Sequence, residues 1–337
     1  MKRKKKNNTM KDVALASGTS ISTVSRVFDP AAKNKISVRT CRKVEKIAAK
    51  MGYVPNRSAR ALSRGGTDTI GLVFPNSTYF EASEYFAKVI MNATAFLRNY
   101  NYDIKVHILR DGEEVESFFS IKQHLNVDGL IMVGIPLSDK FESKNIAEDS
   151  IVMINSGQRP EITTITPDNA QGGFLSAEFF HKEGHEKLGI ITCLPDNSDM
   201  IERKNGFIKY LKQHKLKVNK KWFRDCSPGV DGGFNAACEL LKERNRPTAV
   251  FCVTDETAIG VMCAIRELKL KCPDDIAVIG FDNLAVSQYL SPPLTTIEQP
   301  IAEITQAAVD ILLKMIKTNT SPTHTVFPVK LIERRSV

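Results

Sequence analysis

The segment MKDVALASGTSISTVSRVF, residues 10–28, predicts two short helices joined by a tight turn. The first helix is expected over Met10–Ser17, and the second is expected to begin at Ser20, a residue type that commonly caps helices. Only Gly18 and Thr19 separate them, which is the spacing of a helix-turn-helix. The residues expected to face inward from the first helix are Val13, Ala14 and Ala16.

A third helix is expected over Val38–Met51, with Ser37 as its N-cap and Gly52 at its end. Apolar residues recur along it at spacings of three and four, which predicts a single buried stripe. That stripe consists of Cys41, Val44, Ile47, Ala48 and Met51. The sequence up to residue 54 is therefore expected to form a small all-α head.

The charge of the chain is concentrated around this head. Residues 1–66 contain 17 Lys and Arg against 3 Asp and Glu, whereas the remainder contains 30 against 35. A solvated basic arm is one interpretation, but a surplus of this size in a short segment favours binding to a polyanion. Charge alone leaves DNA, RNA and an anionic membrane as alternatives.

The outer face of the second helix has side chains suited to nucleic acid. Ile21, Ser22, Ser25 and Arg26 are expected on the side opposite Val24. Serine hydroxyls and helix N-termini bind phosphate oxygens, and an arginine can bind a guanine edge. The alternative is a three-helix bundle whose basic surface has no such role.

These segments resemble the head of the lactose/galactose-repressor family. The run over residues 10–28 and the run ISVRTCRKVEKIAAKMGYVPNRSARAL, residues 36–62, contain nearly all of the family pattern D-V-A, A-G-V-S, T-V-S-R-V, G-Y-x-P-N and A-R-x-L. Ser17 and Thr19 depart from the common Ala and Val at the turn, and the hydroxyl of Thr19 then needs a hydrogen-bond partner.

The resemblance implies the DNA-contacting positions and a hinge. Pro55–Ser63 is too short for a stable isolated helix, and the resemblance implies that two such helices pair in the minor groove of an operator. It places Leu62 as a wedge between bases, although an ordinary core leucine is the alternative, and Ala59 where the two helices approach. The residues expected at the DNA are Ser20, Ile21, Ser22, Ser25, Arg26, Thr40, Tyr53, Asn56, Ala59 and Leu62.

From Asp68 onward, apolar β-branched runs alternate with amphipathic helices, which predicts parallel sheets covered on both faces. Two such lobes make a periplasmic-binding-protein-like effector domain. The expected organisation is a basic disordered tail (1–8), a helix-turn-helix domain (9–54), a hinge helix and linker (55–67) and an effector-binding and dimerisation domain (68–337). Lobe 1 is expected at about 68–166 plus 295–325, and lobe 2 at about 167–294 plus 326–337.

Ligands of parallel α/β folds bind beyond the carboxyl ends of the strands. Polar residues at such positions, together with an arginine at the start of a helix, predict an effector pocket. These residues are Asn76, Asn155, Arg203, Thr254, Asp255 and Asp282. Paired hydrogen bonds from carboxylates and amides suit a polyhydroxylated ligand, although Asp255 and Asp282 also lie where helix caps lie.

The resemblance continues through this domain, in VDGLIMVG (127–134) and LSPPLTTIEQP (290–300) among other runs. It implies that Arg203 and Asp282 are pocket residues. The loop after Pro75 is about four residues longer than the family pattern, and Ser227-Pro228-Gly229 stands where many relatives have an aromatic residue. A sugar is the leading effector class, and a nucleobase, a phosphorylated metabolite and a partner protein remain as alternatives.

Several other classes of protein are disfavoured. No run of about 18 apolar residues occurs, and MKRKKKNNT at the start lacks the apolar stretch of a secretory signal, so a cytoplasmic protein without membrane partners is expected. Catalytic motifs are absent and the seven cysteines show no metal-binding spacing, so neither an enzyme nor a metal or cofactor is expected. A periplasmic sugar-binding protein with the same lobes is a further alternative. The expected protein is a homodimeric repressor that binds a pseudo-palindromic DNA operator.

Overall fold

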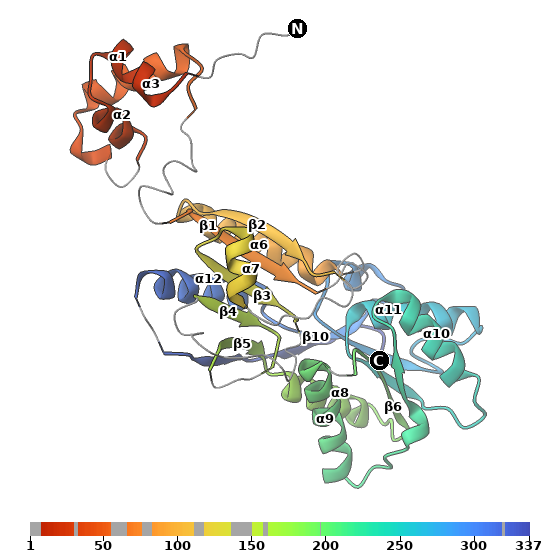
Figure 1. Ribbon diagram of the computed structural model, residues 1–337. Coiled ribbons are helices and arrows are strands. Elements are labelled where there is room, and N and C mark those ends of the chain that lie inside the picture. Colours follow the sequence, from red (N-terminus) through yellow and green to blue (C-terminus); the bar gives the residue numbers. More distant parts are fainter. Residues whose placement is uncertain are drawn as a thin grey trace. The chain divides into compact units, whose positions relative to one another are not determined.

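The computed structural model describes residues 8–29, 33–54, 66–75, 83–110, 118–135, 150–157, 161–195, 197–318 and 321–337. The chain forms two compact units, Met1–Thr67 and Asp68–Val337 (Figure 1). The first is the helical head, and the second contains two β-sheets with their covering helices.

The head contains helices α1 (Met10–Ser17), α2 (Ile21–Val27) and α3 (Val38–Lys50), with a short 3₁₀ turn η1 (Lys33–Lys35) before α3. The side chains at the three N-caps accept hydrogen bonds from backbone amides of the first turn, and they belong to Thr9, Ser20 and Ser37. Gly18 ends α1 with φ 61°, a left-handed conformation that glycine adopts at little cost. These caps account for the close agreement between the predicted and observed helix bounds.

The core of the head differs from the prediction at one position of α1. Ala16 is exposed, so its predicted inward position is wrong, whereas Ser17 is fully buried. The Ser17 hydroxyl donates to the carbonyl of Ala14 and lies 2.8 Å from the Thr19 hydroxyl. The two residues that depart from the family pattern therefore provide hydrogen-bond partners for each other.

Lobe 1 is built on a six-stranded parallel sheet in the order β11-β5-β4-β3-β1-β2. Its strands are β1 (Thr69–Phe74), β2 (Asp103–Ile108), β3 (Gly129–Val133), β4 (Ile151–Ile154), β5 (Thr163–Pro167) and β11 (His324–Phe327). Helices α6 (Glu84–Asn99) and α12 (Ile301–Lys317) pack against each other and share one apolar core with the sheet. Residues of α7 (Phe118–Leu125) pack on a separate cluster.

Lobe 2 has a second six-stranded sheet in the order β12-β10-β9-β8-β6-β7, in which only the β10–β12 pair is antiparallel. Its strands are β6 (Leu188–Cys193), β7 (Phe223–Cys226), β8 (Ala249–Cys252), β9 (Ala277–Phe281), β10 (Thr295–Glu298) and β12 (Lys330–Ile332). One core contains side chains of α8 (Asn169–Lys182) and α9 (Ser198–Gln213), and another contains those of α10 (Val230–Leu241) and α11 (Asp255–Glu267). The 3₁₀ turns are η3 (Lys220–Trp222) and η4 (Ala285–Tyr289).

The chain passes between the two sheets after β5, after β10 and after β11. The expected return to lobe 1 at residue 295 is wrong, because Thr295–Glu298 pairs with β9 in the sheet of lobe 2. The return comes between Glu298 and Ile301, and β11 then keeps the chain in lobe 1 as far as Phe327. Gln299 therefore lies on a crossover segment.

Helices α8 and α9 approach each other at two glycines. A Cβ atom added at Gly173 would lie 1.9 Å from the carbonyl oxygen of Arg203, and one added at Gly206 would lie 1.9 Å from that of Ala170. Because any larger residue would collide with backbone, these glycines allow α9 to lie directly on α8. This packing fixes the position from which the Arg203 side chain extends.

Candidate DNA-binding and effector sites

Helix α2 presents the predicted polar face to solvent. Ile21 is 49% exposed, and Ser22, Ser25 and Arg26 are also exposed. On the opposite side, Val24 and Val27 are buried in the core of the head. The helix therefore has a free face long enough to enter a major groove, with apolar residues that hold it on the head.

The other residues predicted to contact DNA differ in their exposure and in their neighbours. Ser20 caps α2 and is exposed, and the Thr40 hydroxyl lies 2.8 Å from that of Ser37 at the start of α3. Tyr53 is only 9% exposed, and its ring lies 5.8 Å from that of Phe28 in the core. The remaining three, Asn56, Ala59 and Leu62, lie outside the described residues.

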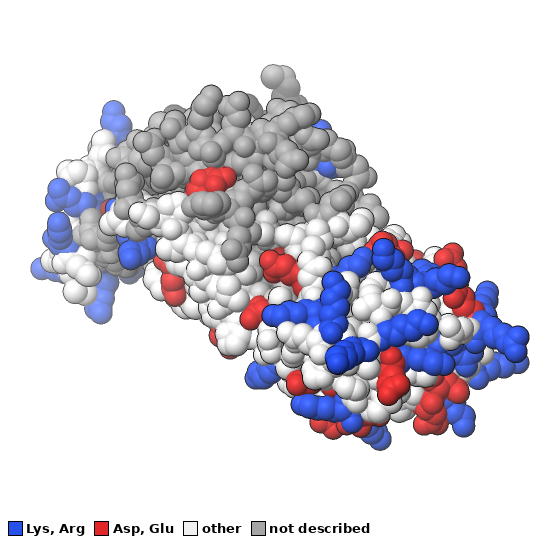
Figure 2. Space-filling view, turned by 90° about the horizontal axis from the view of Figure 1, so that it is seen from below, with Lys and Arg blue, Asp and Glu red and all other residues white. Residues whose placement is uncertain are grey.

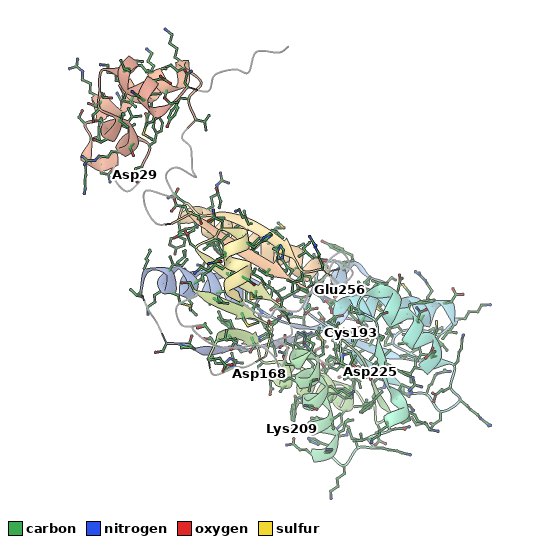
Figure 3. All side chains as sticks on the ribbon, viewed as in Figure 1. Asp29, Asp168, Cys193, Lys209, Asp225 and Glu256 are labelled. Carbon is green, nitrogen blue, oxygen red and sulfur yellow. The ribbon has the colours of Figure 1, made fainter. Side chains whose placement is uncertain are left out.

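Basic residues are exposed on both units. In the described part of the head, eight Lys and Arg side chains are exposed: Lys11, Arg26, Lys35, Arg39, Arg42, Lys43, Lys46 and Lys50. In lobe 2, residues 204–224 contain eight Lys and Arg and no Asp or Glu. Figure 2 shows blue side chains gathered over this lobe, and Figure 3 shows Lys209 on α9. Charge alone therefore does not locate the DNA-binding surface, and the exposed face of α2 is the more specific evidence.

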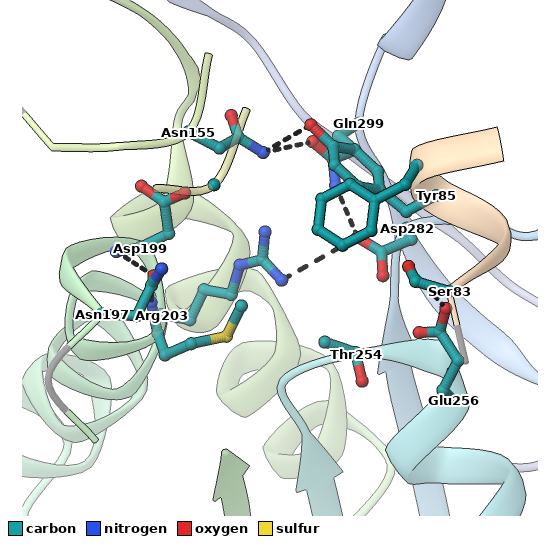
Figure 4. Close-up of a pocket in the computed structure, with 13 residues that line it drawn as sticks. Ser83, Tyr85, Asn155, Asn197, Asp199, Arg203, Thr254, Glu256, Asp282 and Gln299 are labelled. Carbon is teal, nitrogen blue, oxygen red and sulfur yellow. Dashed lines mark hydrogen bonds and ion pairs between the residues drawn. The ribbon is translucent and has the colours of Figure 1, made fainter. Parts of the chain in front are cut away.

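A polar cavity lies between the two lobes of the second unit (Figure 4). Residues of both lobes line it, from the ends of strands and the first turns of helices. They are Ser83, Tyr85, Phe86, Gly134, Asn155, Asn197, Asp199, Met200, Arg203, Thr254, Glu256, Asp282 and Gln299.

Arg203 forms the floor of the cavity on the lobe 2 side and is 2% exposed. Its Nε donates to Asn169 at 2.8 Å, and its Nη1 donates to the carbonyl of Val253 at 2.6 Å. The guanidinium also lies 3.5 Å from the ring centroid of Phe281 and 3.8 Å from the Asp282 carboxylate. The side chain is thus held in one orientation before any ligand arrives.

A chain of hydrogen bonds joins the lobes above Arg203. The Asn155 amide of lobe 1 donates to the Tyr85 hydroxyl at 2.9 Å and to Gln299 at 3.4 Å, and the Gln299 amide donates to Asp282 of lobe 2. Asn155 and Asp282 have φ angles of 52° and 121°, each of which costs about 1–3 kcal/mol in a non-glycine residue. Such strain is concentrated at ligand sites because the geometry there serves binding.

Three carboxyl groups are among the described residues that line the cavity, and burial raises the pKa of each. The pKa of Asp282 is well above its usual value, with Arg203 acting in the opposite direction. Burial also raises the pKa of Asp199 to about 7 and that of Glu256 to about 7. The Ser83 hydroxyl donates to Glu256 at 3.3 Å, which adds a further contact between the lobes.

The volume of the cavity is about 30 Å³. This is room for about two water molecules, whereas small-molecule sites usually measure about 300–1,000 Å³. A larger ligand therefore requires the lining side chains or the lobes to move apart. Binding at this position is consequently linked to the relative position of the lobes.

Four of the predicted effector residues, Asn155, Arg203, Thr254 and Asp282, come together in the cavity. Asn76 lies outside the described residues. Asp255 is not among the lining residues, because its carboxylate accepts hydrogen bonds from the Leu284 amide and from the hydroxyls of Ser287 and Thr296. Thr254 is the N-cap of α11, so the first helical turn directs Asp255 into the protein and Glu256 to the cavity.

Sequence reasoning missed Tyr85, Asp199, Glu256 and Gln299. Gln299 follows strand β10, and Asp199 lies in the first turn of α9. The described residues contain no group of three His, Cys, Asp or Glu that could hold a metal ion. Among the same residues, no helix is long and apolar enough to cross a membrane.

Comparison with known proteins identifies the family. Residues 9–56 match the family model described as bacterial regulatory proteins, lacI family, and residues 177–337 match a periplasmic binding protein-like domain. The HTH-type transcriptional repressor PurR of Klebsiella pneumoniae (strain 342) is 32% identical over 338 residues, which cover 98% of this chain and 96% of that protein. The chain belongs to the lacI family of bacterial regulatory proteins.

Further comparisons agree with this assignment. The ribose operon repressor of Haemophilus influenzae is 32% identical to this lacI-family regulator over 311 residues, 92% of each chain. The crystal structure of the Lac repressor dimer bound to operator and the anti-inducer ONPF matches it with a TM-score of 0.85 at 26% identity, over 98% of this chain and 99% of that one. The predicted helix-turn-helix head and two-lobed effector domain are thereby confirmed, and the relatives are repressors rather than enzymes.

Proposed function

We propose that this lacI-family regulator is a repressor that binds an operator as a homodimer and responds to a carbohydrate bound between its lobes. The observation that carries the effector class is a pair of buried acceptor atoms in the cavity. Asn155 Oδ1 and Asp199 Oδ1 have no hydrogen-bond partner among the described residues. Buried acceptors without donors are costly, so a ligand rich in N–H or O–H donors would be stabilised there.

The charges of the cavity argue against one of the alternatives. Among the described residues that line it are three carboxyl groups and one guanidinium, and two of the five N–H groups of Arg203 already donate to Asn169 and Val253. A phosphorylated metabolite would place its negative charge beside Asp199, Glu256 and Asp282, three groups that become negative whenever they ionise. Hydroxyl groups can donate to carboxylates without that penalty, and the relative from Haemophilus influenzae is named for a ribose operon.

The DNA-binding assignment depends on the exposed face of α2. Ile21, Ser22 and Arg26 would contact base edges and phosphates in a major groove. The family implies that the hinge segment, with Asn56, Ala59 and Leu62, inserts in the minor groove when two chains pair. Met91 on α6 is 72% exposed and Val106 on β2 is 45% exposed, so lobe 1 has apolar surface available for the second chain.

Control of DNA binding would follow from the position of the effector. A ligand that contacts Asn155 of lobe 1 and Arg203 of lobe 2 fixes the separation of the lobes. Lobe 1 begins at Thr69, directly after the linker that leads to the hinge. A change in lobe position therefore changes the spacing at which two hinges can pair on DNA.

A two-part experiment tests the proposed function on the full-length chain. Selection from random DNA should yield a pseudo-palindrome, and thermal-shift screening should show stabilisation by at least one free sugar but not by inorganic phosphate or nucleobases. Selected DNA without two-fold symmetry would contradict the dimer. Stabilisation only by a nucleobase or a phosphorylated compound would contradict the carbohydrate effector.

A further inference from the structure

The described lining of the effector cavity contains more acidic groups than cations. It contains the carboxylates of Asp199, Glu256 and Asp282 and, as the one cation among those residues, Arg203. Each of the four side chains is at most 8% exposed. Buried charges of this kind are normally paired or hydrogen bonded. Without a ligand, the formal excess of two negative charges is offset by the raised pKa of all three carboxyl groups, whereas a bound cation would offset it and leave them ionised.

The three carboxylates differ in their partners. Asp282 lies 3.8 Å from Arg203 and accepts a hydrogen bond from Gln299, and Glu256 accepts one from Ser83. Asp199 Oδ1 accepts none from the described residues, although the side chain is 2% exposed. Asp199 is therefore the acidic group for which the protein provides the fewest donors.

A second orphan acceptor belongs to the segment beside Asp199. Asn155 uses its amide nitrogen to bond Tyr85 and Gln299, which leaves Oδ1 without a donor. A Cβ atom added at Gly157 would lie 2.8 Å from Ser198 Oγ, so the loop that carries Asn155 packs against the start of α9. Figure 4 shows Asn155 and Asp199 on the same side of the cavity, beside Arg203.

We propose that the effector of this cavity carries a protonated amino group that binds between Asp199 and Asn155, which identifies its class as an amino sugar rather than a neutral sugar. The inference rests on the proposed carbohydrate effector and narrows it. An ammonium group has three N–H donors and a positive charge, whereas a hydroxyl group has a single O–H donor and no charge. One ammonium therefore satisfies both orphan acceptors and offsets part of the excess charge.

The proposal also defines which part of the ligand each side of the cavity recognises. The amino group lies at Asp199 and Asn155, and the ring hydroxyls remain for Asp282, Glu256 and Arg203. Because Asn155 belongs to lobe 1 and Asp199 to lobe 2, the amino group contacts both lobes at once. Removing the charge of Asp199 should therefore reduce affinity for an amine more than affinity for a neutral sugar.

The test is calorimetric titration of the full-length chain with three matched sets of probes. Each set contains a hexosamine with a free amine, its neutral parent hexose and its N-acetyl derivative, in the gluco, galacto and manno series. The proteins are the wild type, the isosteric variant Asp199→Asn and the matched control Glu239→Gln, which removes a charge from the exposed face of α10. Retained helical circular dichroism and thermal unfolding show that each variant is folded.

The expected result is that at least one free-amine sugar binds the wild type more tightly than its neutral parent and its N-acetyl form. Asp199→Asn should weaken that binding by about 10- to 100-fold, as for loss of a charged hydrogen bond, and Glu239→Gln should leave it within about twofold. The amino-sugar assignment would be overturned if the neutral parent bound as tightly as its amine, or if Asp199→Asn left the affinity for the amine unchanged. Neither result would contradict the carbohydrate effector. If no sugar of any set binds the folded chain, the amino-sugar assignment is overturned, and the carbohydrate effector is contradicted as well if the thermal-shift screen finds no stabilising sugar.

Discussion

Asp199→Asn should make the effector domain more stable at alkaline pH and should have little effect in acid. In the folded chain, burial raises the pKa of this carboxyl to about 7 against a usual value of 3.8, with Arg203 lowering it and Glu202 raising it. The unfolded chain releases the proton near 4, whereas the folded chain keeps it until pH approaches 7. The stability contributed by the protonated form is therefore complete below about pH 4 and is lost as pH rises through 7.

The size of the effect follows from that difference in pKa. The pKa is about 7 in the folded chain against 3.8, and each pH unit of that difference corresponds to about 1.36 kcal/mol. The free energy of unfolding should therefore fall by about 4 kcal/mol between pH 4 and pH 8. The side chain is 2% exposed, so solvent screening reduces this figure little. Asparagine keeps the shape of the side chain without the charge, so the variant should be about 2–4 kcal/mol more stable than the wild type at pH 8.

Urea denaturation followed by tryptophan fluorescence measures the difference in free energy of unfolding between Asp199→Asn and the wild type directly. Trp222 is the single tryptophan of the chain, it is 2% exposed in lobe 2, and its indole donates to the carbonyl of Asn245 at 2.7 Å. The signal therefore reports lobe 2 and not the head. The control Glu239→Gln should leave the free energy of unfolding within about 0.5 kcal/mol at both pH values.

A variant that is less stable than the wild type at pH 8 would refute this reasoning. It would mean that Asp199 is ionised in the folded chain and is stabilised there by the positive charge of Arg203. A difference of equal size at pH 5 and pH 8 would also refute it, because a packing effect does not follow the titration of a carboxyl group.

The other predictions concern both units. Arg26→Ala should reduce discrimination between operator and random DNA by about 1–3 kcal/mol in competition binding, whereas Lys50→Ala should weaken binding to both by similar amounts. Gly206→Ala should lower the free energy of unfolding by about 3 kcal/mol or more in the tryptophan-monitored titration, since its Cβ would lie 1.9 Å from the Ala170 carbonyl oxygen. Gly184→Ala should lower it by only about 1 kcal/mol, because this residue has φ 86° but its Cβ would have no atom within 4 Å. Leu62→Ala should weaken operator binding far more than non-specific binding, and equal losses would exclude a wedge.

The parts of the fold that sequence predicts well are those with local signals. Ser20 and Ser37 cap their helices as expected, and Thr9 caps the first helix in the same way, because capping depends on neighbouring backbone amides alone. The strands β1 and β3 are apolar apart from Thr69, and they lie in the part of the chain where apolar β-branched runs predict sheets. Ala16 was expected to face inward but is exposed, and Ser17 is buried instead, since two small residues at the end of a short helix give almost no hydrophobic contrast.

The parts that were missed depend on tertiary structure. Thr163–Pro167 and Thr295–Glu298 are strands rich in threonine, and only their pairing in the sheets buries them. The position of Gln299 in the cavity depends on the crossover that follows β10. Asp255 and Glu256 are adjacent in sequence, and the rotation of α11 decides which of them reaches the ligand.

The central claim is that occupation of the interlobe cavity controls operator affinity. Fluorescence anisotropy of the full-length chain on its selected operator, with and without a saturating sugar that binds the cavity, tests it directly. We expect at least a tenfold change in operator Kd for the wild type, within the usual range of coupling between two sites, and no change for Asp282→Asn at the same sugar concentration. An operator Kd that is the same with the cavity occupied and unoccupied in the wild type would contradict the claim.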